Sequence, residues 1–108
     1  NINFIYLLAK NYPTQSLKTF IDIQKNKYKA NCIALIISDN TDKISIVLGA
    51  TNDLINKFDS SKIINDLSKL LGGKGGGGRK DLAQAGGKDK DKIDNGIKFI
   101  KEKINNLN

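Results

Sequence analysis

The residues of this sequence that could do chemistry are concentrated in one stretch rich in glycine. Residues 72–87 read GGKGGGGRKDLAQAGG, and eight of these sixteen residues are glycine. Such a run leaves backbone N–H groups bare and lets a second molecule approach them closely. The basic residues on its two sides, Lys74 and Arg79, suit an anionic ligand. The same residues also fit a helix C-cap followed by a loop, so both interpretations stay open at this point.

The established phosphate-binding motifs do not account for this stretch. A Walker loop needs Ser or Thr after its lysine, whereas Lys74 is followed by Gly75. The dinucleotide pattern G-x-G-x-x-G is met formally by Gly73, Gly75 and Gly78. That motif must follow a strand and open a helix, and here the preceding residues predict a helix. The companion motifs of a kinase glycine loop are absent.

Other catalytic constellations are missing or weak. The chain has no histidine, which excludes histidine acid–base catalysis, histidine triads and imidazole metal sites. The single Cys32 lies in an apolar run and predicts a buried, inert thiol in a reducing compartment. Asp89, Asp91 and Asp94 alternate with lysines, which favours helix capping and a solvated face over a metal site. We therefore expect no catalytic residue and no metal site in this chain.

The charge balance favours a polyanionic partner without choosing one. The formal net charge is +7, from 18 basic and 11 acidic residues. Nucleic acid, an anionic membrane or a phosphorylated ligand would all suit such a surface. However, all but one of the basic residues are lysine, and a lysine-rich composition can also result from mutational bias and not from a binding surface. No apolar run approaches the roughly 20 residues of a membrane span and no signal peptide is visible, so we expect no membrane partner.

The elements that must position the glycine stretch can be read from hydrophobic patterns. Residues 2–9 predict a strand, and the uniformly apolar residues 31–38 predict a strand covered on both faces. Residues 44–50 alternate and complete a hairpin with the strand before them. A polar connection with room for one helical turn follows at 51–59. After the glycines, 82–85 predict a short edge strand.

Three segments show helical spacing. The first is 14–28, whose outward face carries Lys18, Lys25, Lys27 and Lys29. The second begins after a cap at Ser60 or Ser61 and ends at Gly72 in a left-handed C-cap. The third is capped by Asp89 or Asp91, and its apolar stripe consists of Ile93, Ile97, Ile100, Ile104 and Leu107.

The predicted order is strand, helix, two strands, helix, glycine loop, short strand, helix. This order argues for an α/β or α+β fold, with helices packed against a single mixed sheet. We expect residues 1–108 to form one domain. Because the sequence begins at Asn1 without an initiator methionine, we expect it to be a piece of a longer chain.

The order of residues after the glycines carries a resemblance to a known family. Residues 72–79, GGKGGGGR, followed by 81–87, DLAQAGG, closely resemble the signature of the C-Ala domain near the C-terminus of bacterial alanyl-tRNA synthetase. This domain belongs to the DHH-associated family. The resemblance covers most of the chain, including the helix that ends on the double glycine and the closing amphipathic helix. Lys80 departs from it, since the familiar form has proline there, and the glycine run is one residue longer than the commonest form.

The resemblance implies a tRNA-binding domain that is not itself catalytic. It would contact tRNA(Ala) near the outer corner of the tRNA and help the aminoacylation and editing domains act on one tRNA. The full-length protein would be a cytoplasmic alanine–tRNA ligase, and ATP, magnesium and zinc would belong to its other domains. Gln84 would hydrogen-bond a base, or else only tie the glycine loop to the sheet. The residues expected to contact phosphate or ribose are Lys74, Arg79 and Lys80, together with the backbone N–H groups of Gly75, Gly76, Gly77 and Gly78.

Two alternative functions remain. The domain could serve mainly as a dimerisation or interdomain module, with the stripe of the last helix packed across a two-fold axis of a homodimer. The competing and favoured interpretation is that this stripe covers the domain's own sheet. The chain could also be the substrate-binding lobe of a DHH-family phosphoesterase. Those proteins commonly have a histidine near the glycine motif, and this chain has none.

Overall fold

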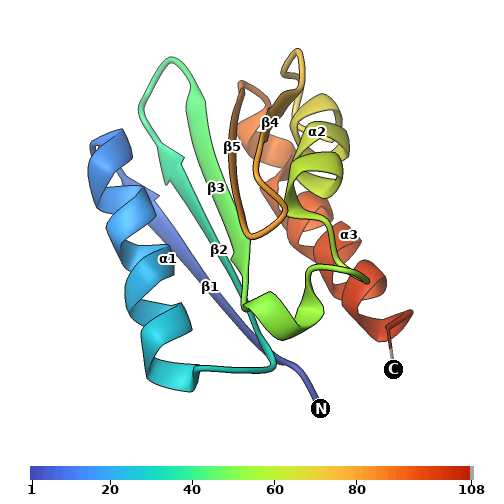
Figure 1. Cartoon of the computed structure of the whole chain (residues 1–108). Coiled ribbons are helices and arrows are strands. Elements are labelled where there is room, and N and C mark those ends of the chain that lie inside the picture. The colour runs from blue at the N-terminus through green and yellow to red at the C-terminus, as the bar shows by residue number, and fades with distance from the viewer. Residues whose placement is uncertain (108) are drawn as a thin grey trace.

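One mixed sheet of five strands separates two layers of helices. In the computed structural model, which describes residues 1–107, α1 covers one face of the sheet and α2 and α3 cover the other (Figure 1). The predicted fold class is therefore confirmed, with helices on both faces. The strands are β1 (Asn3–Lys10), β2 (Cys32–Asp39), β3 (Ile44–Ala50), β4 (Gly76–Gly78) and β5 (Leu82–Gly87). The helices are α1 (Thr14–Tyr28), α2 (Ser60–Leu70) and α3 (Ile93–Asn105), with short 3₁₀ turns at Asn52–Leu54 and Lys90–Lys92.

The strand order in the sheet is β1-β2-β3-β5-β4. β1 and β2 are parallel, and α1 connects them. All other neighbours are antiparallel, and β2 and β3 form the predicted hairpin. A parallel pair needs a long crossover connection, which is the reason that the lysine-rich helix lies between the first two strands in the sequence.

The core has two parts, one on each face of the sheet. Leu35 and Leu48, which pair across β2 and β3, pack toward α2 and α3. Ile36 and Val47, the next pair along, pack toward α1. β2 is thus covered on both faces, which explains why its sequence is apolar throughout. The alternation predicted for β3 is also confirmed.

Cys32, at the start of β2, is free and fully buried. Burial raises the pKa of its thiol, since the thiolate would lose its hydration. A raised pKa keeps the thiol protonated, and the buried position predicted from the apolar run is confirmed.

The stripe of the last helix is used inside the domain. Ile97, Ile100 and Ile104 of α3 are buried in the part of the core that the sheet shares with α2. Gly96 of α3 packs tightly against α2, because an added Cβ would be 2.9 Å from a Leu67 methyl group. The favoured interpretation, that this stripe covers the domain's own sheet, is therefore confirmed.

The glycine stretch contains a strand that the sequence did not predict. Gly72 ends α2 with a φ of +80°, as expected for a left-handed C-cap. Gly76–Gly78 then form β4, which takes the edge position next to β5. The expected edge strand is therefore an inner one, and it is longer than predicted, running over Leu82–Gly87. A strand of bare glycines has no side-chain pattern, so only its backbone pairing reveals it.

Two predicted helix caps are corrected by the structure. The carboxylate of Asp59, not Ser60 or Ser61, caps α2, because it accepts hydrogen bonds from the backbone N–H groups of Ser61 at 3.0 Å and Lys62 at 3.4 Å. Neither Asp89 nor Asp91 caps α3. A 3₁₀ turn comes between these residues and the helix, so Lys92 occupies the N-cap position.

Within residues 1–107, no helix has both the length and the apolar character needed to cross a membrane.

Candidate nucleic-acid interface

The tip of the β4–β5 hairpin is held in place by Asp81. The hairpin closes with a hydrogen bond of 2.9 Å from the Arg79 backbone N–H to the Leu82 carbonyl. The Asp81 carboxylate accepts a hydrogen bond of 3.0 Å from Nε of Arg79 and pairs at 3.4 Å with Nζ of Lys25 on α1. Nζ of Lys25 also donates to the Asp81 carbonyl at 3.0 Å. Through these contacts α1 fixes the position of the hairpin.

The charges at this tip favour the ionised carboxylate. Partial burial raises the pKa of Asp81, but the hydrogen bond from Arg79 and the positive charges of Lys25 and Arg79 outweigh it, so the pKa lies below its usual value. The side chain of Lys25 is only 17% exposed. Spacing alone had placed Lys25 on the solvated face of the helix, whereas the structure gives it a bridging role.

Helix α2 holds the other end of the glycine strand. Oγ of Ser68, which is buried, accepts a hydrogen bond from Gly75 N–H at 3.1 Å and donates one to the Gly86 carbonyl at 2.5 Å. Oδ1 of Asn65 accepts from Gly76 N–H at 3.3 Å. The sequence analysis did not single out Ser68 or Asn65, because a polar residue on a helix gives no sign of which loop it meets.

These bonds decide which of the nominated glycine N–H groups face outward. Gly75 and Gly76 already donate to α2. The hydrogen bond from the Arg79 N–H to the Leu82 carbonyl makes these two residues a hydrogen-bonded pair. Because hydrogen-bonded and non-hydrogen-bonded pairs alternate along an antiparallel ladder, the N–H of Gly77 points toward β5 and that of Gly78 toward the free edge. Among these four, the N–H of Gly78 is therefore the best placed to meet a ligand.

A groove runs between α1 and the β4–β5 hairpin and consists of two adjoining pockets. The first has a volume of about 220 Å³ and the second about 260 Å³, and both are lined by Val47 and Gln84. We call this feature the α1 groove. The first pocket is also lined by Lys18, Gly77, Gly78, Arg79, Leu82 and Ala83. The second is also lined by Thr14, Leu17, Ser45, Ile46, Gly75, Gly76 and Ala85.

The structure brings most, but not all, of the expected site residues to this groove. Gln84, Arg79 and the glycines 75–78 line it. Lys74 and Lys80 are exposed and lie outside both pockets. Lys18 does line the groove, although spacing had grouped it with the other lysines of α1. The position of Lys18 along α1 places it beside Gly77, Gly78 and Arg79 of the hairpin, and the spacing of the lysines does not reveal this.

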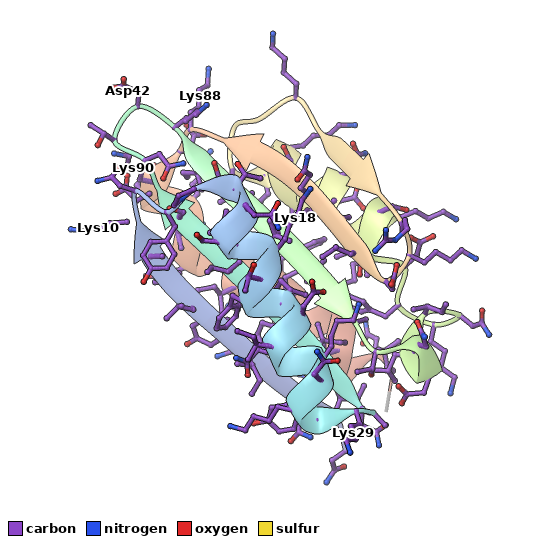
Figure 2. The ribbon with its side chains drawn as sticks, turned by 60° about the vertical axis from the view of Figure 1, so that its left-hand side comes forward. Lys10, Lys18, Lys29, Asp42, Lys88 and Lys90 are labelled. Carbon is purple, nitrogen blue, oxygen red and sulfur yellow. The ribbon has the colours of Figure 1, made fainter. Side chains whose placement is uncertain are left out.

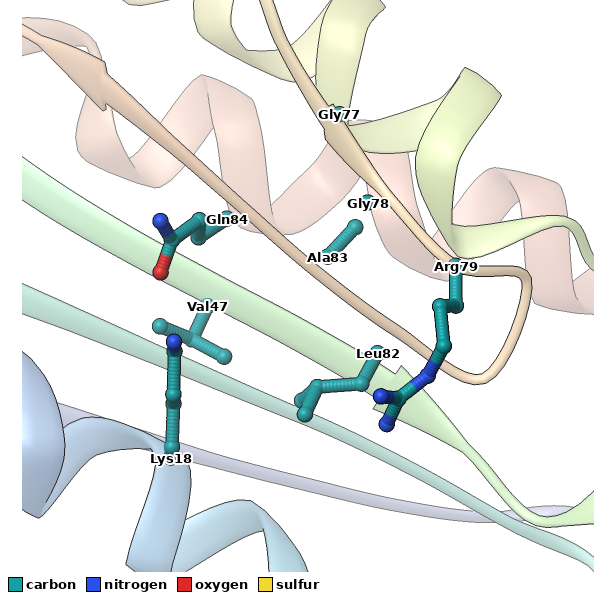
Figure 3. Close-up of a pocket in the computed structure, with 8 residues that line it drawn as sticks. All are labelled: Lys18, Val47, Gly77, Gly78, Arg79, Leu82, Ala83 and Gln84. Carbon is teal, nitrogen blue, oxygen red and sulfur yellow. The ribbon is translucent and has the colours of Figure 1, made fainter.

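The first pocket offers two cations and an amide over an apolar floor. Figure 3 shows Lys18 extending from α1 and Arg79 from the hairpin, with Gln84 on β5 and the side chain of Val47 between α1 and β5. The side chain of Arg79 is 71% exposed, and its contact to Asp81 is made through Nε. The terminal nitrogens of its guanidinium therefore remain available for an anion.

Positive charge is not confined to this groove. Figure 2 shows Lys10, Lys88 and Lys90 at one end of the sheet, near Asp42, and Lys29 at the opposite end of α1. One of these charges is paired, since Lys90 contacts Asp39 at 2.8 Å. Positive charge is thus spread over both ends of the molecule as well as the groove.

The fold and the glycine hairpin define a class of protein. Residues 1–106 match the DHHA1 domain, and the chain belongs to this family. More particularly, it is 40% identical over 86 residues to alanine–tRNA ligase of Rhodopseudomonas palustris, a match that covers 80% of this chain and 10% of that protein. The crystal structure of the C-Ala domain from Aquifex aeolicus alanyl-tRNA synthetase has a TM-score of 0.88 and 32% identity to the chain, covering 95% of this chain and 91% of that one.

These comparisons confirm the resemblance that the glycine motif carried. The chain is similar to a C-Ala domain over nearly its whole length. The matched region is about a tenth of the length of the curated relative.

Proposed function

We propose that this chain is the tRNA-binding C-terminal domain of an alanyl-tRNA synthetase and that it binds tRNA(Ala) at the α1 groove. Its family membership and its likeness to a C-Ala domain support the proposal. The observation that carries it is the pair of cations, Lys18 and Arg79, that line the same pocket as Gln84. Each cation can meet a phosphate of the RNA backbone, the contacts that supply most sequence-independent affinity.

In this proposal the domain binds tRNA and does not itself catalyse the ligation. The full-length protein would be a cytoplasmic alanine–tRNA ligase, and ATP, magnesium and zinc would be bound outside this chain. Lys74 and Lys80, which are exposed beside the hairpin, would extend the phosphate contacts beyond the groove.

RNA titrations at two salt concentrations test the proposal. The chain is titrated into labelled tRNA(Ala), a non-cognate tRNA and an RNA duplex at about 50 and about 200 mM salt. We expect tRNA affinity to fall steeply with salt, because phosphate contacts release counterions. Arg79→Ala and Lys18→Ala should each weaken binding and reduce the salt slope by about one.

A matched control removes a lysine that is far from the groove. Lys98 is exposed on α3, the helix on the opposite face of the sheet. Lys98→Ala loses the same charge as Lys18→Ala, and we expect it to leave tRNA affinity nearly unchanged. Affinity that responds neither to salt nor to Arg79→Ala would contradict the proposed contacts.

One observation favours a second, structural role. β1 is an edge strand on which Tyr6, Leu7 and Leu8 are 43%, 38% and 51% exposed. An exposed apolar edge is a ready surface for another domain of the synthetase or for a second copy of the chain. Sedimentation at several concentrations distinguishes a homodimer of this chain from a contact with another domain. A strict monomer would exclude the homodimer and leave the interdomain contact as the alternative.

A further inference from the structure

Gly77 is the one residue of β4 whose lack of a side chain the fold does not require. A Cβ on Gly76 would collide with Ala85, and a Cβ on Gly78 would lie 2.7 Å from the Leu82 carbonyl oxygen. Gly78 also has a φ of +149°, which disfavours any other residue. In contrast, Gly77 has no positive φ, and its added Cβ would have no other atom within 4 Å.

The open space at Gly77 belongs to the first pocket of the α1 groove. Gly77 pairs with Gln84 on β5, and Gln84 pairs with Val47 on β3, so the three residues form a row across the sheet. All three line the pocket. Side chains of directly paired residues point to the same face, so a side chain at position 77 would stand beside Gln84. The missing side chain therefore widens the floor of the pocket.

The size and lining of this pocket suit one planar aromatic ring system. Its volume of about 220 Å³ is below the roughly 300 Å³ at which pockets for drug-sized ligands begin. The lining is largely apolar, and the exposed amide of Gln84 offers a donor and an acceptor at its margin. Lys18 and Arg79 provide positive charge at its sides.

We propose that the pocket over Gly77 takes one unpaired RNA base, with its polar edge toward the Gln84 amide and its neighbouring phosphates toward Lys18 and Arg79. This inference rests on the proposed RNA-binding function and names the class of RNA that the groove accepts. A base inside a duplex is paired and stacked on both sides, so it cannot enter. The groove therefore selects RNA that presents an unstacked nucleotide.

The test compares single-stranded and duplex RNA on variants of the 108-residue chain. The probes are a ten-nucleotide oligoadenylate, because a glutamine amide pairs well with adenine, and a blunt RNA duplex of the same length. Gly77→Ala places a methyl group in the pocket, and we expect about a tenfold loss of oligoadenylate affinity and little change for the duplex. Gln84→Ala, which alters an exposed side chain, should cause a similar selective loss.

Gly86→Ala is the matched control. Gly86 lies in β5 outside both pockets, and its added Cβ would make only ordinary contact, 3.6 Å from the Ile44 carbonyl oxygen. We expect it to bind both RNAs as the unaltered chain does. Thermal unfolding of each variant separates a loss of binding from a loss of folding.

The outcomes distinguish this inference from the function on which it rests. Selective loss of oligoadenylate binding in Gly77→Ala and Gln84→Ala supports the base pocket. Binding of the duplex at least as tight as that of oligoadenylate, with both unchanged by the two variants, overturns the base pocket and leaves RNA binding intact. No binding to any RNA overturns the proposed function, and the base pocket with it.

Discussion

At the scale of single residues, carboxylates at chain turns tie neighbouring segments of this domain together. Asp81 joins the hairpin tip to α1 through Lys25 and orients the guanidinium of Arg79. Asp59 closes the first turn of α2. The sequence marked both turns as polar, but many polar residues lie close to them. Which carboxylate makes the bond depends on where the backbone N–H groups and cations lie in space.

The cap of α2 gives a prediction at this scale. Asp59→Ala leaves backbone N–H groups at the start of α2 without their partner, so we expect the free energy of unfolding to fall by about 1 kcal/mol. Asp59→Asn should retain most of the stability, because asparagine is an equally good N-cap residue. Urea unfolding measures both variants. Equal stability of Asp59→Ala and the unaltered chain would show that the cap contributes nothing.

At the scale of elements, the hydrophobic pattern located the long helices and strands well. The boundaries of α1 and β3 agree with those predicted, and β1 and β2 are shifted by one residue. The glycine strand was missed, because β4 has no side chains to form a pattern. Its place at the edge follows from tertiary contacts, namely pairing with β5 and the hydrogen bonds that Gly75 and Gly76 donate to side chains of α2.

The contact between α2 and the glycine strand gives a prediction at the scale of elements. Ser68→Ala removes a buried hydroxyl and leaves its two partners, the Gly75 N–H and the Gly86 carbonyl, without that hydrogen bond. We expect a loss of about 1–3 kcal/mol in unfolding free energy and faster amide hydrogen exchange in the hairpin.

Asn65→Ala is the comparison for this change. The bond from Gly76 N–H to Asn65 is longer, at 3.3 Å, and exposed, so its loss should have a smaller effect. If Asn65→Ala destabilised the domain more than Ser68→Ala, the buried serine would not be the main support of the strand.

At the scale of the whole molecule, the titratable groups predict how stability depends on pH. Four carboxyls in different parts of the chain have pKa values below the usual 3.8. A hydrogen bond from Lys90 lowers the pKa of Asp39, one from Thr51 lowers that of Asp53, and one from Ser61 lowers that of Asp59. For Asp81, burial is the largest single effect and raises the pKa, but the hydrogen bond from Arg79 and the positive charges of Lys25 and Arg79 together outweigh it. The unfolded chain then binds more protons than the folded one in acid, so stability falls as pH drops below about 4.

We therefore expect a plateau of stability followed by an acid decline. Between about pH 5 and 8 no histidine can titrate, because the chain has none, and stability should be nearly constant. The stabilisation from the lowered carboxyl pKa values should be lost as the pH falls through the folded-state values. Urea unfolding at several pH values measures the profile. Constant stability down to pH 3 would contradict the assigned pKa directions.

The fold class, the family and the absence of histidine chemistry were determined by the sequence itself. Periodicity determined the α/β class and most elements, since each must bury an apolar face. The glycine motif, through its order of residue types, determined the family, which the matches over residues 1–106 confirm. The absence of histidine determined that histidine-based chemistry is not available.

Only the tertiary structure decided which groups of the motif can meet a ligand. It placed Lys18 from a distant helix beside Arg79 and Gln84, and it used the N–H groups of Gly75 and Gly76 for contacts with α2. It also showed that close packing explains the glycines at 76 and 78 and leaves the glycine at 77 unexplained. The physical reason is that local sequence fixes backbone preferences, whereas the space around a residue depends on segments far away in the chain.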